Sequence, residues 1–141
     1  MKTTVDFHLI GAMNTEQIFH AACQLTEQAY RQQHTVYLYA ESEDSLKVLD
    51  NLLWSFRDDS FLPHQLWLGE TSETASVLLG CPESPLPPAA DVLINLVTTV
   101  PNFYAQFSKV LELIPEEPVA RQLARERYRY YKSQGCELVT R

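Results

Sequence analysis

Four basic side chains near the end of the chain have the spacing of a single helix face: Arg121, Arg125, Arg129 and Lys132. At about 100° per residue, these spacings place all four on one side of an α-helix, with Tyr128 beside them. The helix is expected over residues 117–134. Arginine binds carboxylates through a planar fork of N–H donors, so this face predicts recognition of a short acidic segment.

The rest of the chain is acidic. The 141 residues carry a net charge of −7, and five of the eleven Lys and Arg residues lie in this one helix. Such a balance does not suit general nucleic-acid binding, which depends on a broad basic surface. Two other interpretations of the basic face stay open. It could be an ordinary solvated helix face, or a direct single-stranded DNA site, because arginine and tyrosine can stack on bases.

Catalytic, metal and cofactor motifs are absent from the sequence. Its four glycines form neither a GxGxxG fingerprint nor a GxxxxGK[ST] loop. The histidines lack HExxH spacing, the three cysteines lack paired spacing, and there is no GxSxG. We therefore expect no catalytic residues, no metal and no cofactor. A nucleotide-binding enzyme of similar fold is the alternative.

Strand and helix patterns alternate along the chain. Strands are expected at residues 4–10, 35–40, 65–68, 75–79, 91–96, 110–114 and 137–140. Helices are expected at 15–33, from 42 or 43 onward, from Pro101 through Phe103, Tyr104 and Phe107, and at 117–134. Residues 81–88 hold four prolines and are expected to be a loop. This order predicts one three-layer α/β domain over residues 1–141. It has a mainly parallel sheet with helices on both faces, like nucleotide-binding folds but without a phosphate loop.

Several side chains have simple structural interpretations. Cys23 lies on the apolar stripe of its helix and is expected in the core. Arg127 falls on the apolar side of the basic helix and is expected to pair with a carboxylate of the body. The aromatic group at 103, 104 and 107 is expected to cover the sheet, His8 to lie in a strand, and His64 in a loop. Leu46, Leu49, Leu53 and Trp54 are expected to share one helix face. No window resembles a signal peptide or a membrane span, so a cytoplasmic location is expected.

Three separated segments carry a family resemblance: QLARERYRYY (122–131), LDNLLWSFRDDSFLPH (49–64) and DVLINL (91–96). With the rest of the chain, they resemble the chi subunit of bacterial DNA polymerase III. The resemblance implies a non-catalytic accessory subunit of the clamp-loader complex in DNA replication. It implies binding to the psi subunit and to the acidic C-terminal tail of single-stranded-DNA-binding protein. Some members partner an XPD-like helicase through the psi surface.

The resemblance also assigns site residues. The tail would bind at Arg121, Arg125, Tyr128 and Ile114, with the terminal phenylalanine of the tail in an apolar pocket. Arg121 stands where the family is expected to have lysine. Trp54 and Phe61 would contact psi or the helicase. No membrane and no direct sequence-specific nucleic-acid contact is implied. The loop at 81–88 is shorter than in the family and is given no role.

Overall fold

Seven strands form one sheet in the order β3-β4-β2-β5-β6-β1-β7, and every neighbouring pair is parallel. The computed structural model describes residues 2–11, 14–55, 62–69 and 75–141. The elements in chain order are β1 (Thr4–Leu9), α1 (Thr15–Arg31), β2 (Val36–Tyr39), α2 (Glu43–Ser55), β3 (His64–Leu66), β4 (Val77–Gly80), β5 (Ala90–Asn95), the 3-10 turn η1 (Tyr104–Gln106), β6 (Phe107–Ile114), α3 (Pro118–Ser133) and β7 (Glu137–Thr140).

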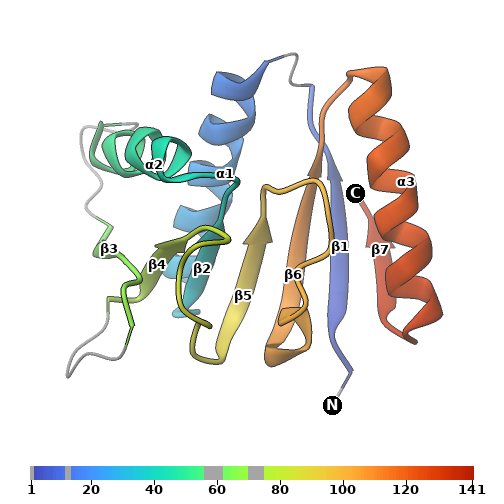
Figure 1. The fold of residues 1–141 in the computed structure, drawn as a ribbon. Coiled ribbons are helices and arrows are strands. Elements are labelled where there is room, and N and C mark those ends of the chain that lie inside the picture. Colours follow the sequence, from blue (N-terminus) through green and yellow to red (C-terminus); the bar gives the residue numbers. More distant parts are fainter. Residues whose placement is uncertain (1, 12–13, 56–61, 70–74) are drawn as a thin grey trace.

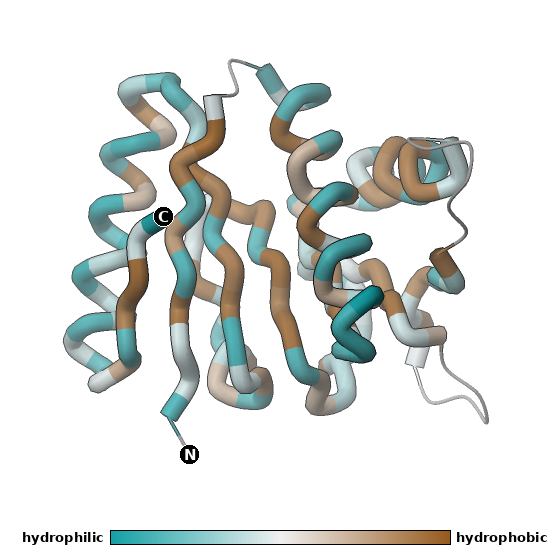
Figure 2. The backbone as a smooth tube through the Cα atoms, turned by 180° about the vertical axis from the view of Figure 1, so that it is seen from behind, coloured by the Kyte–Doolittle hydropathy of each residue, from teal (hydrophilic) through white to brown (hydrophobic). Residues whose placement is uncertain are grey.

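Helices lie on both faces of the sheet, which confirms the predicted three-layer α/β fold (Figure 1). Helices α1 and α2 pack on one face, and the view from behind shows α1 crossing it (Figure 2). Helix α3 covers the other face at the β1 and β7 end. The connections that follow β4 and β5 descend across the rest of that face.

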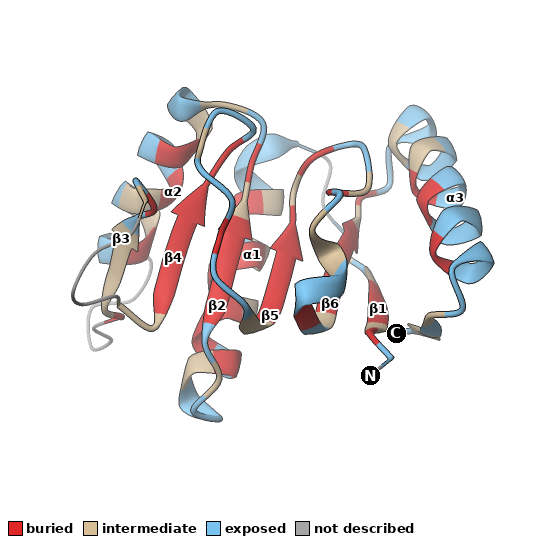
Figure 3. Cartoon of the chain, turned by 60° about the horizontal axis from the view of Figure 1, so that its bottom comes forward, coloured by how far each residue is buried: buried red, intermediate tan, exposed pale blue. Residues whose placement is uncertain are grey.

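The central strands are apolar on both sides because layers cover both sides (Figure 3). Helix α1 presents Phe19, Ala22 and Cys23 to this core. Its first turn is capped by Asn14, whose side chain accepts a hydrogen bond from the amide of Gln17 (2.9 Å). Burial raises the pKa of the Cys23 thiol to about 12, so Cys23 is a core residue as predicted.

Strand β6 begins at Phe107, three residues before the predicted strand. The predicted helix from Pro101 is correspondingly reduced to the turn η1, and Phe107 does not belong to it. The first residues of β6 do not follow the hydrophobic pattern of a strand, because Lys109 faces a region of the sheet that no helix covers. There its ammonium lies 3.8 Å from the Asp6 carboxylate. Phe107 is nevertheless buried, so the prediction of an aromatic sheet cover is confirmed for it.

Two predictions on the α2 side were wrong. His64 does not lie in a loop but begins β3, and its ring Nε2 lies 3.0 Å from an Asp50 oxygen. Leu46, Leu49 and Leu53 do share the buried face of α2. Trp54 does not, since it is 56% exposed. It follows Leu53 by one position, and a 100° rotation turns its ring out of the core.

Candidate functional site

Helix α3 has clear start and stop signals. Glu117 is its N-cap, and its carboxylate accepts hydrogen bonds from the amides of Val119 (3.0 Å) and Ala120 (2.7 Å). Pro118 occupies the first turn, where its missing N–H is not needed. Gly135 follows the helix with a φ of +79°, a conformation that favours glycine. The sequence therefore fixes both ends of the helix that carries the basic side chains.

A buried polar network fixes the rotation of α3 against the sheet. Glu112 of β6 is fully buried and accepts hydrogen bonds from Arg127 Nε (3.0 Å), Asn95 Nδ2 (2.9 Å) and the Tyr131 hydroxyl (2.7 Å). Arg127 also donates to the carbonyl of Thr98 (3.0 Å). The predicted pairing of Arg127 with a body carboxylate is confirmed, and its partner is Glu112.

Burial dominates the electrostatics of this network. It raises the pKa of Glu112 above its ordinary value, while the charge of Arg127 and the hydrogen bonds from Asn95 and Tyr131 act against that rise. Burial and the neighbouring Glu112 both raise the pKa of Tyr131, so its hydroxyl keeps its proton and acts as a donor. The inner face of α3 is thus held by directed bonds as well as by apolar packing.

The outer face of α3 borders a groove of about 420 Å³. Four basic residues of the helix, called the basic ridge below, line it: Arg121, Arg125, Arg129 and Lys132. The remaining lining residues come from β1, β6, β7 and α3: Phe7, Leu9, Ile114, Thr140, Ala124 and Tyr128. All four residues assigned to tail binding from the sequence therefore meet in one groove.

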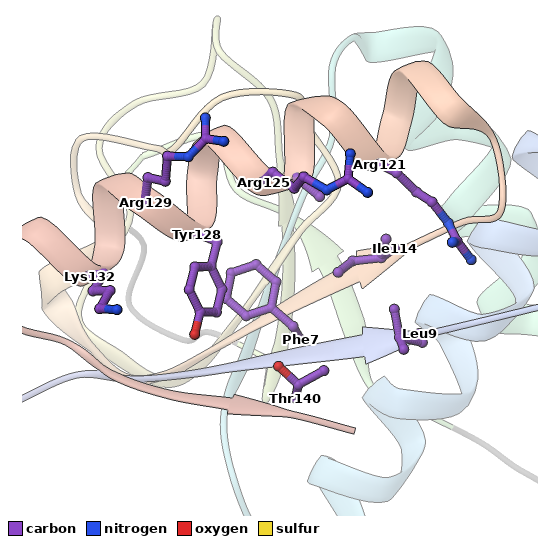
Figure 4. A pocket seen from close by; sticks show the side chains of 10 residues that line it. Phe7, Leu9, Ile114, Arg121, Arg125, Tyr128, Arg129, Lys132 and Thr140 are labelled. Carbon is purple, nitrogen blue, oxygen red and sulfur yellow. The ribbon is translucent and has the colours of Figure 1, made fainter.

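The groove combines an apolar floor with a cationic wall. The ring of Tyr128 packs against Phe7 with centroids 5.3 Å apart, and Tyr128 is still 38% exposed. Leu9 is 57% exposed at the end of β1. Figure 4 shows Arg121 and Arg125 extending on the same side of the helix, near Ile114. Leu9 and Tyr128 are thus accessible from solvent and Ile114 partly so, whereas Phe7 and Ala124 are buried beneath them.

The positive charges of the ridge are available to a ligand. Arg125 makes only a long hydrogen bond to its neighbour Gln122 (3.4 Å). Within the described part of the chain, no carboxylate forms an ion pair with any ridge residue. Four uncompensated cations beside exposed apolar side chains can bind a segment that carries both carboxylates and an apolar group.

The second predicted surface is only partly described. Trp54 lies at the end of α2, on the side of the sheet opposite to the ridge, and its ring lies 4.8 Å from that of His64. Phe61 falls outside the described residues. The structure thus places Trp54 on the surface, and its pairing with Phe61 stays a prediction.

Sequence reasoning missed three parts of the site. Phe7 and Leu9 were seen as strand residues, but alternation alone did not tell which layer would lie above them. Thr140 carried no signal of its own. Glu112 could have been found, because a single charged residue inside the apolar run LELI indicates a buried partner.

Nothing in the described ranges resembles a catalytic or metal centre. No cluster of three or more possible metal ligands occurs there, and no helix there is long and apolar enough to cross a membrane. The described residues form an all-parallel α/β domain whose notable surface feature is a basic groove with an apolar floor, a surface that suits a binding protein.

Comparison with known proteins gives the particular family. Residues 1–139 match the family described as DNA polymerase III chi subunit, HolC. The chi subunit of Pseudomonas aeruginosa is 43% identical over 138 residues, covering 96% of this chain and 94% of that protein. The Escherichia coli chi subunit is 33% identical over 138 residues, covering 98% and 89%. The Haemophilus influenzae chi subunit is 27% identical over 140 residues, covering 99% and 97%.

The chain therefore belongs to the DNA polymerase III chi subunit family. This membership supports a role as a replication accessory protein within the DNA polymerase III complex, not itself catalytic.

Proposed function

We propose that this chi subunit bridges the psi subunit of the clamp loader to the acidic C-terminal tail of single-stranded-DNA-binding protein, in the cytoplasm. The observation that carries the proposal is the groove beside α3, where the basic ridge borders an open apolar floor. A tail with acidic side chains and a terminal phenylalanine offers the complementary chemistry. Its carboxylates match the ridge, and its ring matches the floor.

Each predicted residue has a task in this proposal. Arg121 and Arg125 lie on consecutive turns and can each hold a carboxylate with two parallel hydrogen bonds. Ile114 and the Tyr128 ring, supported from below by Phe7, provide apolar surface for the phenylalanine. The terminal carboxylate of the tail would lie beside its own ring, within reach of the same guanidinium groups.

The chemistry of the groove suits a moderate affinity. Exposed ion pairs contribute roughly 0.2–1 kcal/mol each, and burial of a phenylalanine side chain roughly 1.5–3 kcal/mol. Their sum, reduced by the cost of ordering the tail, is too small for nanomolar binding and favours a Kd in the micromolar range or weaker. Because the ridge is exposed, added salt should weaken the complex.

The psi subunit, or an XPD-like helicase in its place, would bind at the surface of Trp54 and Phe61. Trp54 is a large exposed aromatic side chain, the residue type that most often anchors a protein interface. It lies on α2, over the β3 and β4 end of the sheet, whereas the ridge lies over the β1 and β7 end (Figure 1). This separation supports simultaneous binding of both partners.

The test is a titration of the tail peptide against Arg125→Ala. We expect at least a tenfold loss of affinity, equivalent to about 1.4 kcal/mol, because two parallel hydrogen bonds from Arg125 to a carboxylate are stronger than a simple exposed ion pair. Folding and psi binding should be unchanged. Arg31→Ala is the matched control, because Arg31 is an exposed arginine on α1 that pairs only with Glu27 of its own helix. A peptide without its terminal phenylalanine should lose most of its binding. Equal affinity for wild type and Arg125→Ala would refute the assignment.

A further inference from the structure

The face of the sheet that carries α3 has a second cleft, away from the basic ridge. In place of a helix, two irregular connections descend over this face, one after β4 in front of β2 and one after β5 in front of β6 (Figure 1). Between them lies a cleft of about 420 Å³. Tyr37 and Tyr39 of β2 line it, together with Pro82 and residues 84–87 of the first connection and residues 99–103 of the second.

Both walls of this front cleft are held in place. In the first connection, the Trp67 indole donates a hydrogen bond to the Leu86 carbonyl (3.1 Å), and Gln106 donates to that of Pro87 (3.4 Å). In the second, the side-chain amide of Asn95 donates to the Thr99 carbonyl (3.1 Å). Prolines in both connections further limit backbone freedom. The cleft is therefore a formed feature of the fold.

Aromatic rings make up much of the cleft. Tyr37 and Tyr39 stack with centroids 6.0 Å apart, and Phe103 packs edge-on against Tyr39 at 5.0 Å and 85°. Tyr39 and Phe103 are only partly buried. In an edge-on pair, one ring contributes only its edge to the contact, so neither of its two faces is used by that contact. The cleft thus retains aromatic surface for a ligand to stack on.

The surroundings of the cleft are acidic although its lining is uncharged. Burial raises the pKa of the Tyr39 hydroxyl, and Cys81, Glu41 and Glu83 lie close enough to add to this rise. Glu41 is held at this position by the Thr98 amide, which donates to it (3.0 Å). Among the residues that the structure describes, no lysine or arginine lines the cleft. An anion would be repelled here, and a cation attracted.

We propose that the front cleft binds an arginine side chain presented by a partner protein. A guanidinium is planar, stacks on tyrosine and phenylalanine, and is less strongly hydrated than an ammonium, so it enters an aromatic cleft at lower cost than lysine. Its methylene stem matches the proline and leucine walls, and its N–H groups can reach the carboxylates outside the cleft. The charge preference is opposite to that of the α3 groove, so this site stands independently of the tail proposal.

Titration with N-acetyl-L-arginine methylamide, followed by amide chemical shifts of the intact protein, tests this site. We expect millimolar binding, with shifts concentrated at Tyr39, Ser84 and Phe103. The citrulline analogue has the same shape without the charge and should not bind. Glu83→Gln, at an exposed position, should weaken binding roughly two- to fivefold. Phe103→Leu should weaken it by a similar factor through loss of the ring.

Two outcomes would overturn the proposal. Equal binding of the citrulline analogue would show that charge plays no part. Shifts spread over the acidic surface, unchanged in both variants, would show only general electrostatic attraction. Glu83 is exposed, and a glutamine at this position can still accept the hydrogen bond from the Cys81 thiol, so this variant remains informative even if Phe103→Leu proves unstable.

Discussion

Removal of the Glu112 carboxylate should be among the most destabilising single changes in this protein. Glu112→Ala takes away the acceptor of three hydrogen bonds and leaves Arg127 charged, buried and without an anionic partner. Loss of one partner of a buried ion pair costs about 3–5 kcal/mol. The total stability of such a domain is about 5–15 kcal/mol, so the variant should fold but be marginal.

Removal of both charges should cost much less. In the double variant Glu112→Leu with Arg127→Met, no buried charge is left unpaired. Tyr131 loses its acceptor, and Asn95 keeps its bond to the Thr99 carbonyl. At about 1 kcal/mol for each neutral hydrogen bond, the double variant should lose about 1–2 kcal/mol. The difference between the two variants isolates the penalty of the unpaired guanidinium.

Urea unfolding followed by far-UV circular dichroism measures both values, and an unchanged m-value would show that the comparison is valid. The reasoning is refuted if Glu112→Ala loses less than about 1 kcal/mol. It is also refuted if the double variant is as unstable as the single one. A titration of the tail peptide tests the same reasoning at the proposed site. Glu112→Ala should weaken peptide binding, because it removes the acceptor that fixes the rotation of α3.

Three further changes test other parts of the structure. A Cβ on Gly80 would lie 1.8 Å from the Tyr37 hydroxyl, so Gly80→Ala should lose about 1–3 kcal/mol in thermal unfolding. Tyr37→Phe in the same chain should restore part of this loss. Native-state alkylation followed by mass spectrometry should label the half-buried Cys136 long before Cys23, whose burial raises its pKa to about 12. Gln33 adopts a φ of 65° after α1, so Gln33→Gly should raise the unfolding free energy by about 1 kcal/mol in urea titration.

Local chemistry predicted the site helix well. The N-terminal prolines and acids and the later glycine placed α3 within one residue of its observed ends, and β7 fell at the predicted residues. Helical periodicity also separated Arg127 from the ridge, because a rotation of 200° from Arg125 leaves the outer face. Each of these signals is local, because it depends only on residues within a few positions of one another in the sequence.

The parts of the site and of the fold that were not predicted depend on contacts between segments that are distant in the sequence. Phe7 and Leu9 become groove residues only because β1 pairs with β6 beneath α3. The first residues of β6 were not predicted as strand because Lys109 interrupts the apolar pattern, at a part of the sheet that has no helix above it. In each case the residue pattern was correct, but the layer above it could not be known from local sequence.

The helix termini explain why a fold of this type need not bind a nucleotide. In nucleotide-binding α/β domains, free amides at a helix N-terminus hold the phosphates. Here the first amides of α3 bond to the carboxylate of Glu117, and an amide of α1 bonds to Asn14. A carboxylate therefore caps the N-terminus of α3, and it would repel a phosphate at that end of the helix. Anion recognition is instead available from the outer face of α3, through side chains rather than backbone amides. A charged arginine side chain can reach out to a partner's flexible chain, which a recessed backbone site cannot.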